Sequence, residues 1–447
     1  MFHELQQGAR LTTKFHKELV VVDRLGDGGQ GVVYKVLYDG QPKALKWYRP
    51  DLFDNLEDRD KFIQNLSRNI RAGRPTPEFL WPIDMTALVE GSFGYVMDLR
   101  PPEYVEASDL FLDPGLFPTF RRAIDTCLHI VSAFRVLHDK GYCYQDVNGG
   151  NFFVNPQTGA VLICDNDNVA PAGTDTGIRG TPRFMAPEIV CENKVPSTQS
   201  DLHSMAVLIF FLLMAQHPLE GRRMSQSVAL DSDVQRRLYG TDPLFVMDPN
   251  DRSNRPDGVH VNVLKVWPTL PKHMQEFFMR AFSQDALHQR TRRISEYRWT
   301  LELARLRSEV VVCNCGNEVF LQDARPVVCD NVACGREVRT NLRAELEQYY
   351  LPVSNDMRIY RCQTCICNAD EALDPMAWFL MARGDAGVLG VRNMSYAPWQ
   401  TIVGDTVRQV PPRAALPVSA GMTLCINGSN IRITENVHEA SASESEE

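Results

Sequence analysis

The sequence has no long hydrophobic run, no excess of positive charge and no apolar leader at its start. The longest apolar run, residues 205–215, is only about half of the roughly 20 residues that a membrane helix needs, so it predicts a buried helix of a globular domain. Residues 1–15 lack an apolar core behind a basic start. We therefore expect no signal peptide, no membrane association and a cytoplasmic location.

Charge and composition exclude further classes of protein. Lys and Arg number 47 against 56 Asp and Glu, and the formal net charge of -9 argues against a protein that mainly coats nucleic acid or an anionic membrane. Hydrophobic residues make up 44% of the 447 residues, which excludes wholesale disorder and a fibrous repeat. The chain is long enough for two or three domains.

The order of patterns along the chain predicts an α+β protein in several parts. Up to about residue 53, short β-branched runs broken by glycine indicate an antiparallel sheet, and from residue 121 to about 307 helical periodicity dominates. We expect a small β-lobe, a larger helical lobe, a cysteine-rich stretch and a β-rich segment. The predicted boundaries are 1–17 for an N-terminal extension, 18–307 for the two lobes, 311–345 for the cysteine stretch, 346–434 for a small β-rich module and 435–447 for a disordered acidic tail.

The 12 cysteines are distributed unevenly. Those at 127, 143, 164, 191 and 425 are scattered singly, which suits a reducing compartment, and the others lie between residues 313 and 367. Paired thiols on tight turns with glycine are the layout of a tetrahedral zinc ribbon, and the predicted Zn2+ ligands are Cys313, Cys315, Cys329 and Cys334. A second zinc site, a site shared with the first and a redox pair are open for the remaining thiols. Zinc is the interpretation that we favour for Cys362, Cys365 and Cys367.

A glycine-rich turn, LGDGGQG at residues 25–31, lies between two strand-like runs. Its glycines would let backbone N–H groups approach phosphate oxygens. A dinucleotide-binding fold would need a helix directly after the last glycine, but Val32 and Val33 continue as a strand. The alternation of the next strand places Ala44 and Lys46 on one face, toward whatever the glycine turn covers.

Further along, two carboxylates and an amide follow at a spacing that suits phosphoryl transfer. That chemistry needs a carboxylate to orient an attacking hydroxyl and accept its proton, and oxygen ligands that hold magnesium on the nucleotide phosphates. Asp146, Asn151 and Asp165 supply this set.

On these residues the sequence resembles the eukaryotic-like protein kinase family over residues 18 to 307. The most specific motif is GTPRFMAPE at 180–188, which is similar to the end of a kinase activation segment. The resemblance implies an ion pair between Glu188 and Arg293, catalytic roles for Asp146 and Lys46, and Mg2+ held by Asn151 and Asp165. The residues that it implies for ATP binding are Leu25, Gly26, Gly28, Gly31, Val33, Ala44, Lys46, Met97, Asp98 and Leu99.

Two departures from the family pattern concern the catalytic loop. Gln145 stands in place of the arginine of H-R-D, so we do not expect activation by a phosphate switch. Asn148 stands in place of a lysine, which removes a cation near the γ-phosphate and predicts slower chemistry. The candidate autophosphorylation residues are Thr174, Thr176 and Thr181.

Two other departures concern the surroundings of Lys46. D-F-G is replaced by Asp165-Asn166-Asp167, and Asn65 stands where the family has a glutamate. The orientation of Lys46 must then come from an amide, from Glu57 or from no partner. For the nearby basic patch of Arg68, Arg71 and Arg74 we favour a solvated face over a docking surface.

The sequence thus predicts a bilobal kinase fold and a bacterial eukaryotic-like serine/threonine protein kinase with a C-terminal zinc ribbon, using ATP, Mg2+ and Zn2+ on a protein substrate. By analogy, a PP2C-type phosphatase and a von Willebrand A-type protein are possible partners, and nucleic acid is not expected. One alternative is a pseudokinase scaffold that binds nucleotide or a partner. Another is a binding protein whose zinc and β modules recruit a partner or nucleic acid, through basic residues that include Arg325, Arg336, Arg339 and Arg343.

Overall fold

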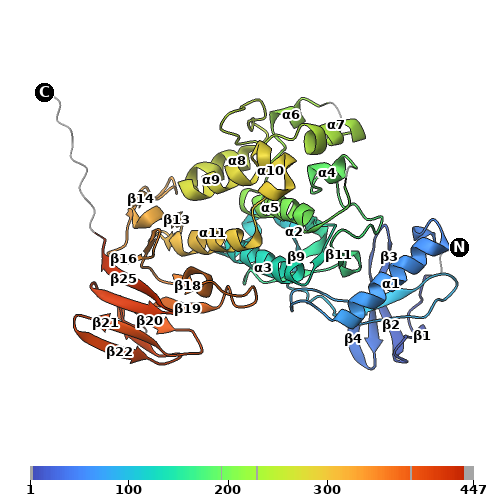
Figure 1. The fold of residues 1–447 in the computed structure, drawn as a ribbon, viewed down its shortest axis with the longest axis horizontal. Coiled ribbons are helices and arrows are strands. Elements are labelled where there is room, and N and C mark those ends of the chain that lie inside the picture. Colours follow the sequence, from blue (N-terminus) through green and yellow to red (C-terminus); the bar gives the residue numbers. More distant parts are fainter. Residues whose placement is uncertain (1–3, 193, 228–229, 383–384, 437–447) are drawn as a thin grey trace.

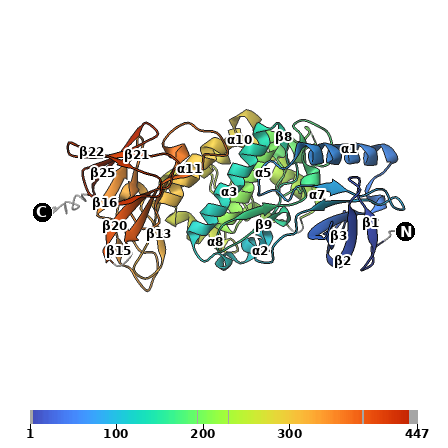
Figure 2. The same ribbon diagram turned by 90° about the horizontal axis from the view of Figure 1, so that it is seen from below.

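The structure, a computed structural model, describes residues 4–192, 194–227, 230–382 and 385–436. A β-lobe, a helical lobe and a C-terminal region follow one another along the chain (Figure 1). In both views of the ribbon the β-lobe and the C-terminal region lie at opposite ends of the helical lobe (Figures 1 and 2).

The β-lobe is a six-stranded antiparallel sheet in the order β1-β2-β3-β4-β6-β5, accompanied by one long helix. Its first strand lies within residues 1–17, the predicted extension, and pairs with the second strand, so that segment adds to the sheet. The helix begins where the side chain of Asn55 accepts a hydrogen bond from the backbone N–H of Asp58. The elements are β1 (Arg10–Thr12), β2 (Glu18–Asp27), β3 (Gly31–Tyr38), β4 (Gln41–Tyr48), α1 (Leu56–Ala72), β5 (Asp84–Met85) and β6 (Gly94–Met97).

The helical lobe is built around two helices, α3 (Phe120–Asp139) and α5 (Thr198–Met214). Every residue from Ser200 to Met214 is buried, which confirms the buried helix predicted from the apolar run. Ser197 and Ser200 form a capping box at its start. The other helices are α2 (Ala107–Leu112), α4 (Pro187–Val190), α6 (Arg222–Ser225), α7 (Ser232–Arg236), α8 (Val261–Val266), α9 (Lys272–Ala281), α10 (Gln284–His288) and α11 (Glu296–Glu309). The short strands are β7 (Val105–Glu106), β8 (Tyr142–Cys143), β9 (Phe152–Val154), β10 (Val161–Ile163) and β11 (Ala170–Pro171).

The C-terminal region starts with two short hairpins and continues as two antiparallel sheets, ordered β17-β16-β25-β24-β21-β22 and β18-β19-β20-β23, that enclose a core of their own. The hairpins are β12 (Val310–Val312) with β13 (Glu318–Phe320), and β14 (Val327–Val328) with β15 (Glu337–Val338). The remaining strands are β16 (Leu342–Glu345), β17 (Tyr350–Pro352), β18 (Arg358–Tyr360), β19 (Pro375–Ala382), β20 (Asp385–Asn393), β21 (Trp399–Val403), β22 (Thr406–Val410), β23 (Ala415–Pro417), β24 (Met422–Ile426) and β25 (Ser429–Glu435).

Two predicted boundaries in this region differ from the structure. β16 falls inside the range 311–345 but pairs with β17 and β25, so the β-rich module begins at Leu342 rather than at residue 346. At the other end Glu435, placed in the predicted tail, belongs to β25, and residues 437–447 lie outside the described residues.

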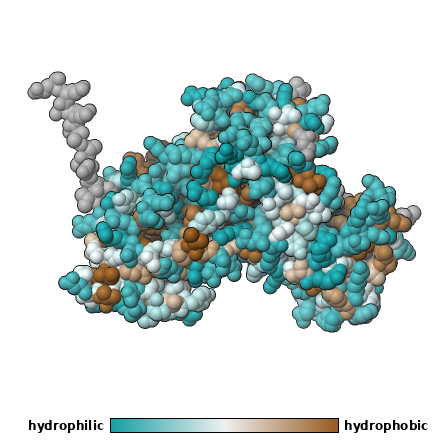
Figure 3. Space-filling model, viewed as in Figure 1, coloured by the Kyte–Doolittle hydropathy of each residue, from teal (hydrophilic) through white to brown (hydrophobic). Residues whose placement is uncertain are grey.

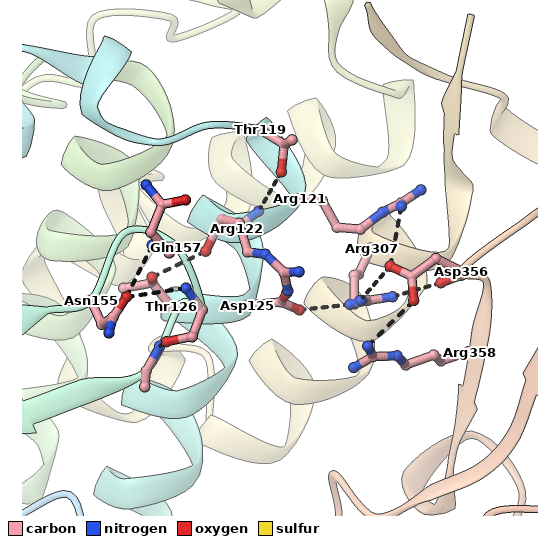
Figure 4. Close-up of polar contacts among 12 residues, drawn as sticks. Thr119, Arg121, Arg122, Asp125, Thr126, Asn155, Gln157, Arg307, Asp356 and Arg358 are labelled. Atoms are coloured by element: carbon pink, nitrogen blue, oxygen red, sulfur yellow. Dashed lines mark hydrogen bonds and ion pairs between the residues drawn. The ribbon is translucent and has the colours of Figure 1, made fainter. Parts of the chain in front are cut away.

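Buried charges attach this region to the helical lobe. Arg307 of α11 is fully buried, and its guanidinium contacts Asp125 of α3 at 2.6 Å and Asp356 of the β17–β18 loop at 3.3 Å (Figure 4). Asp356 also pairs with Arg121 of α3 at 3.2 Å and with Arg358 at 3.3 Å. Because buried charges are stable only when paired, this network fixes the loop against both helices.

None of the described helices is long and apolar enough to cross a membrane. On the face drawn in Figure 3, hydrophobic residues are scattered in small groups among hydrophilic ones.

Candidate functional site

The glycine-rich turn closes the hairpin of β2 and β3. The backbone N–H of Gly28 donates to the carbonyl oxygen of Gly31 at 2.9 Å, and a Cβ on Gly31 would lie 2.1 Å from the carbonyl oxygen of Trp47 on β4. Only glycine fits there. A Cβ on Gly26 would meet nothing within 4 Å, so the turn leaves open space beside its backbone.

Lys46 of β4 is buried, and its ammonium group has three partners. Its Nζ lies 2.7 Å from Oε1 of Gln30 in the glycine turn, 3.2 Å from Asp165 and 3.1 Å from Asp167. Burial lowers the pKa of Lys46, but attraction first to Asp167 and then to Asp165 outweighs it, so the pKa is raised and the side chain is charged.

The cluster also contains Asp167, Tyr48 and Tyr95, none of which is predicted as a site residue from the sequence. The Tyr48 hydroxyl donates to Asp167 at 2.6 Å and the Tyr95 hydroxyl donates to it at 3.1 Å. A signal was present for Tyr48, since strand alternation places it on the same face as Lys46. Tyr95 is the partner of Lys46 across β4 and β6.

The residues that the sequence predicts for catalysis and for metal binding near Asp146 are brought together around its carboxylate. Its carboxylate accepts hydrogen bonds from the Asn148 side chain at 3.0 Å, from the Thr181 hydroxyl at 3.2 Å and from the Asn151 side chain at 3.4 Å. The Asn151 amide nitrogen also donates to the backbone oxygen of Asp146 at 2.8 Å, which leaves the Asn151 side-chain oxygen free to face another ligand. Asn148 therefore orients the Asp146 carboxylate and, being neutral, supplies no cation.

Asp165 follows β10 with a left-handed backbone (φ 50°) and contacts Lys46, which links the Asp165 segment to the β-lobe. Burial raises the pKa of the Asp165 carboxyl more than the attraction of Lys46 lowers it. A carboxylate oxygen on Asp165 and the amide oxygen of Asn151 are hard donors of the kind that Mg2+ prefers.

The segment that contains Thr174 and Thr176 is held by Gln145. The Thr176 hydroxyl donates to Gln145 Oε1 at 2.5 Å, and Gln145 Nε2 donates to the backbone oxygen of Thr174 at 3.5 Å. Asp175 and Arg179 form an ion pair within the segment at 2.8 Å. A cavity of about 800 Å³ is lined by Gln30, Asp167, α1 and residues 174–179.

The predicted apolar surroundings of the adenine ring share one buried cluster. Ala44 and Met97 are buried in it, and Val33 and Leu99 are packed against it. Leu25 at the entry to the glycine turn is 49% exposed. The Asp98 carboxylate pairs with Lys43 at 2.5 Å and with Arg74 at 3.6 Å, so its side chain supports the segment after β6.

Two supporting contacts of the helical lobe agree with the resemblance. Arg293 and Glu188 form a two-pronged ion pair with distances of 2.8 and 2.6 Å. Asp201 of α5 accepts hydrogen bonds from the backbone N–H groups of Tyr144 and Gln145, at 2.6 and 3.1 Å. Asp201 therefore fixes the backbone that leads into Asp146.

The four ribbon cysteines converge. The sulfur atoms of Cys313, Cys315, Cys329 and Cys334 all lie within 4.8 Å of one another, and two of the separations are 3.7 Å. A tetrahedral zinc ion with bonds of about 2.3 Å requires sulfur separations of about 3.8 Å. A backbone hydrogen bond from Asn317 lowers the pKa of Cys315 to about 7, which favours the thiolate.

The other cysteine cluster is different. Within the described part of the chain, the four ribbon thiols form the one set of three or more candidate metal ligands that lie this close. The second zinc site at Cys362, Cys365 and Cys367 therefore stays a prediction. Cys362 is buried in the core shared with the helical lobe, and Cys367 packs against that core.

Comparison with known proteins shows similarity over part of the chain. Residues 96–290 match the family model of the protein kinase domain. Serine/threonine-protein kinase 36 of Mus musculus is 26% identical over 268 residues, which are 55% of this chain and 19% of that protein. Serine/threonine-protein kinase pkn2 of Myxococcus xanthus is 27% identical over 218 residues, which are 45% of this chain and 25% of that protein.

The chain thus spans a quarter or less of the length of these two relatives. Among solved structures, the kinase domain of PknI from Mycobacterium tuberculosis has a TM-score of 0.45 and 19% identity, and it covers 67% of this chain and 99% of its own. The match to the protein kinase domain covers residues 96–290, and the glycine turn and Lys46 come before them in the β-lobe.

Proposed function

We propose that this protein is an ATP-dependent serine/threonine protein kinase that acts in bacterial signalling. The observation that carries the proposal is the convergence of Lys46, Asp165, Asn151 and Asp146, of which only Lys46 lies outside the match to the protein kinase domain. These residue types supply what phosphoryl transfer needs, namely a cation for the phosphates, oxygen ligands for a metal and a carboxylate for the attacking hydroxyl.

Each residue has a specific role in this proposal. The open backbone of the glycine turn and the Lys46 ammonium bind the phosphates of ATP, and the apolar cluster of Ala44, Met97 and Leu99 receives the adenine. Asn151 and Asp165 hold Mg2+, which neutralises charge on the phosphates when it is bound. Asp146 orients the substrate hydroxyl and accepts its proton.

Turnover is expected to be slow. Asn148 places a neutral amide on Asp146 where the resemblance implies a lysine, and each 1.36 kcal/mol of lost transition-state stabilisation lowers a rate about tenfold. The neutral Gln145, which already holds Thr176, supports a segment ordered without phosphate.

The test is transfer of the γ-phosphate from Mg-ATP to the protein itself and to generic protein substrates. Transfer is expected in the wild type and in a control, Asp405→Asn, that changes an exposed residue of the C-terminal module. It is expected to disappear in Asp146→Asn and in Asp165→Ala. Transfer that survives in Asp146→Asn would contradict the role of that carboxylate.

The alternative is a pseudokinase scaffold, which the neutral residues at 145 and 148 favour. ATP binding without transfer would support it. In the basic set of the C-terminal region, Arg339 and Arg343 lie near Glu337 and Glu345, at 3.8 and 3.5 Å. These pairs weaken the case for recruitment of nucleic acid. The phosphatase and von Willebrand A-type partners and the cytoplasmic location stay predictions.

We also propose that Cys313, Cys315, Cys329 and Cys334 hold a structural zinc ion. The sulfur separations of 3.7 Å support this ligand set. The short hairpins β12–β13 and β14–β15 enclose a small core, so the metal would contribute much of their folding free energy.

A further inference from the structure

The partner of Lys46 is the feature of the β-lobe that the sequence left open. Of the three possibilities, Glu57 is directed elsewhere, because it pairs with Lys61 at 2.8 Å and is 77% exposed. An amide does contact Lys46, but it is Gln30 of the glycine turn. The carboxylates beside the ammonium group come from Asp165 and Asp167.

These two carboxylates differ in their surroundings. The Asp167 side chain is fully buried, and both of its oxygens receive hydroxyl donors, Tyr48 on Oδ2 and Tyr95 on Oδ1. The Asp165 side chain is 31% exposed. A phosphate can therefore replace Asp165 or Gln30 at Lys46. The Asp167 side chain has no exposed surface, and its carboxylate needs the cation to remain buried.

The helix α1 supports this arrangement from the other side. The Asn65 amide donates to the backbone oxygen of Val169 at 2.8 Å, and its own oxygen accepts from Arg68 at 3.1 Å, which fixes the orientation of the amide. Asn69 donates to the same oxygen of Val169 at 2.8 Å. The helix thus supplies amides that hold the backbone of the segment, and the segment supplies the carboxylate.

We propose that Asp167 is the positioning residue that holds Lys46 in place for the phosphates of a nucleotide, while Asp165 is left for the metal ion. The part concerning nucleotide rests on the proposed function, and the ion pair itself does not. In this arrangement Lys46 keeps one permanent partner when a ligand displaces the other two.

The first experiment is a thermal double-mutant cycle on the full chain without nucleotide. Asp167→Asn is expected to lower the melting temperature of the wild type. In the background of Lys46→Met the same change is expected to raise it, because it then removes a buried carboxylate that has lost its cation.

Two further changes serve as controls in both backgrounds. Asp165→Asn is expected to depend little on the background, since the carboxylate is partly hydrated. Asp84→Asn changes a buried carboxylate of β5 that accepts a hydrogen bond from the Tyr38 hydroxyl at 3.1 Å, and its effect is expected to be the same in both backgrounds.

The second experiment is titration with ADP, with and without Mg2+. Asp167→Asn and Lys46→Met are expected to weaken Mg-free binding by a similar factor, about tenfold for one charge-assisted contact. Asp165→Asn is expected to remove the gain in affinity that Mg2+ gives.

The outcomes separate the two proposals. The proposed ion pair is wrong if Asp167→Asn changes the melting temperature equally in both backgrounds. It is also wrong if the sign reversal occurs for Asp165→Asn instead. If the single variant Asp167→Asn does not fold, folding of the double variant with Lys46→Met shows the same sign reversal. If neither variant folds, the proposal is overturned. Unchanged Mg-free ADP affinity in Asp167→Asn overturns the positioning role. A wild type that binds no ADP contradicts the proposed function, and the thermal cycle still decides the pair.

Discussion

The contact between the helical lobe and the C-terminal module gives the sharpest stability prediction. Arg307→Met removes the guanidinium that bridges Asp125 and Asp356 but keeps a long apolar side chain in the buried space. Both carboxylates keep other cations, because Arg122 lies 2.8 Å from Asp125, and Arg121 and Arg358 pair with Asp356 (Figure 4).

The expected cost follows from these remaining contacts. Breaking a buried ion pair costs roughly 3–5 kcal/mol when one charge is left without a partner. Because neither carboxylate is left alone here, we expect the lower end, about 3 kcal/mol. For a domain of 150–250 residues this corresponds to a fall in Tm of about 6–12 °C.

Thermal unfolding together with amide hydrogen exchange measures this effect. We expect faster exchange in the loop at Asp356 and in β18, with the sheet β24–β25 still protected. The matched control is Arg10→Met, which removes an arginine from an ion pair with Glu18 whose side chains are 70% and 58% exposed, and we expect a change of about 1 kcal/mol or less there. A loss in Arg307→Met as small as that of the control would refute the view that this network fixes the module.

Three other predictions concern metal, pH and the activation segment. A zinc chelator is expected to release zinc and to make the ribbon thiols reactive, whereas metal retained in Cys313→Ser but lost in Cys191→Ser would contradict the ligand set. Burial lowers the pKa of His138 and His273, but hydrogen bonds that His138 donates to Asp201 and Glu296, and that His273 donates to Glu302 and Glu309, raise both pKa values to about 9. Because the folded state then holds these protons more tightly, the protonated histidines stabilise it fully below pH 6.5, and this stabilisation is lost as the pH rises to about 9. Urea unfolding should show a fall in the free energy of unfolding across this range, and a constant value would contradict the prediction. Thr176→Val removes the donor to Gln145, about 1 kcal/mol, and should speed proteolytic cleavage within residues 174–181. Thr174→Val should not, because Gln145 contacts Thr174 through its backbone oxygen.

Much of the fold could be predicted from local patterns. The strand Met422–Ile426 and the helix around residues 121–138 follow from periodicity, which reports burial along one element. The boundary at Leu342 could not be predicted in this way. β16 pairs with β25, about 90 residues away, and the sequence has no local signal for that pairing.

The site shows the same division. The motifs predict Lys46, Asp146, Asn151 and Asp165 as site residues, but the raised pKa of Lys46 depends mainly on Asp167, which lies 121 positions away. In the sequence, Asp167 stands in a run of Asp and Asn that is typical of turns. Only the packing of β4 and β6 against that segment shows that it is a buried carboxylate with three donors.

The helix α3 contacts both Arg307, which binds the C-terminal module, and Asp201, which holds the backbone before Asp146. Near its start α3 carries Asp125, which contacts Arg307, and near its end it carries His138, whose Nε2 lies 3.1 Å from Asp201. Asp201 in turn holds the backbone N–H groups before Asp146.

A 20-residue helix is about 30 Å long and moves as a rigid element. The C-terminal module and the β-lobe lie at opposite ends of the helical lobe (Figures 1 and 2), and α3 is one of the connections between the module and the segment before Asp146. The helix has one arrangement in this structure, and coupling requires a second. We therefore expect Arg307→Met to lower stability much more than the rate of phosphate transfer measured well below its Tm, and a parallel loss of both would show that α3 transmits the position of the module.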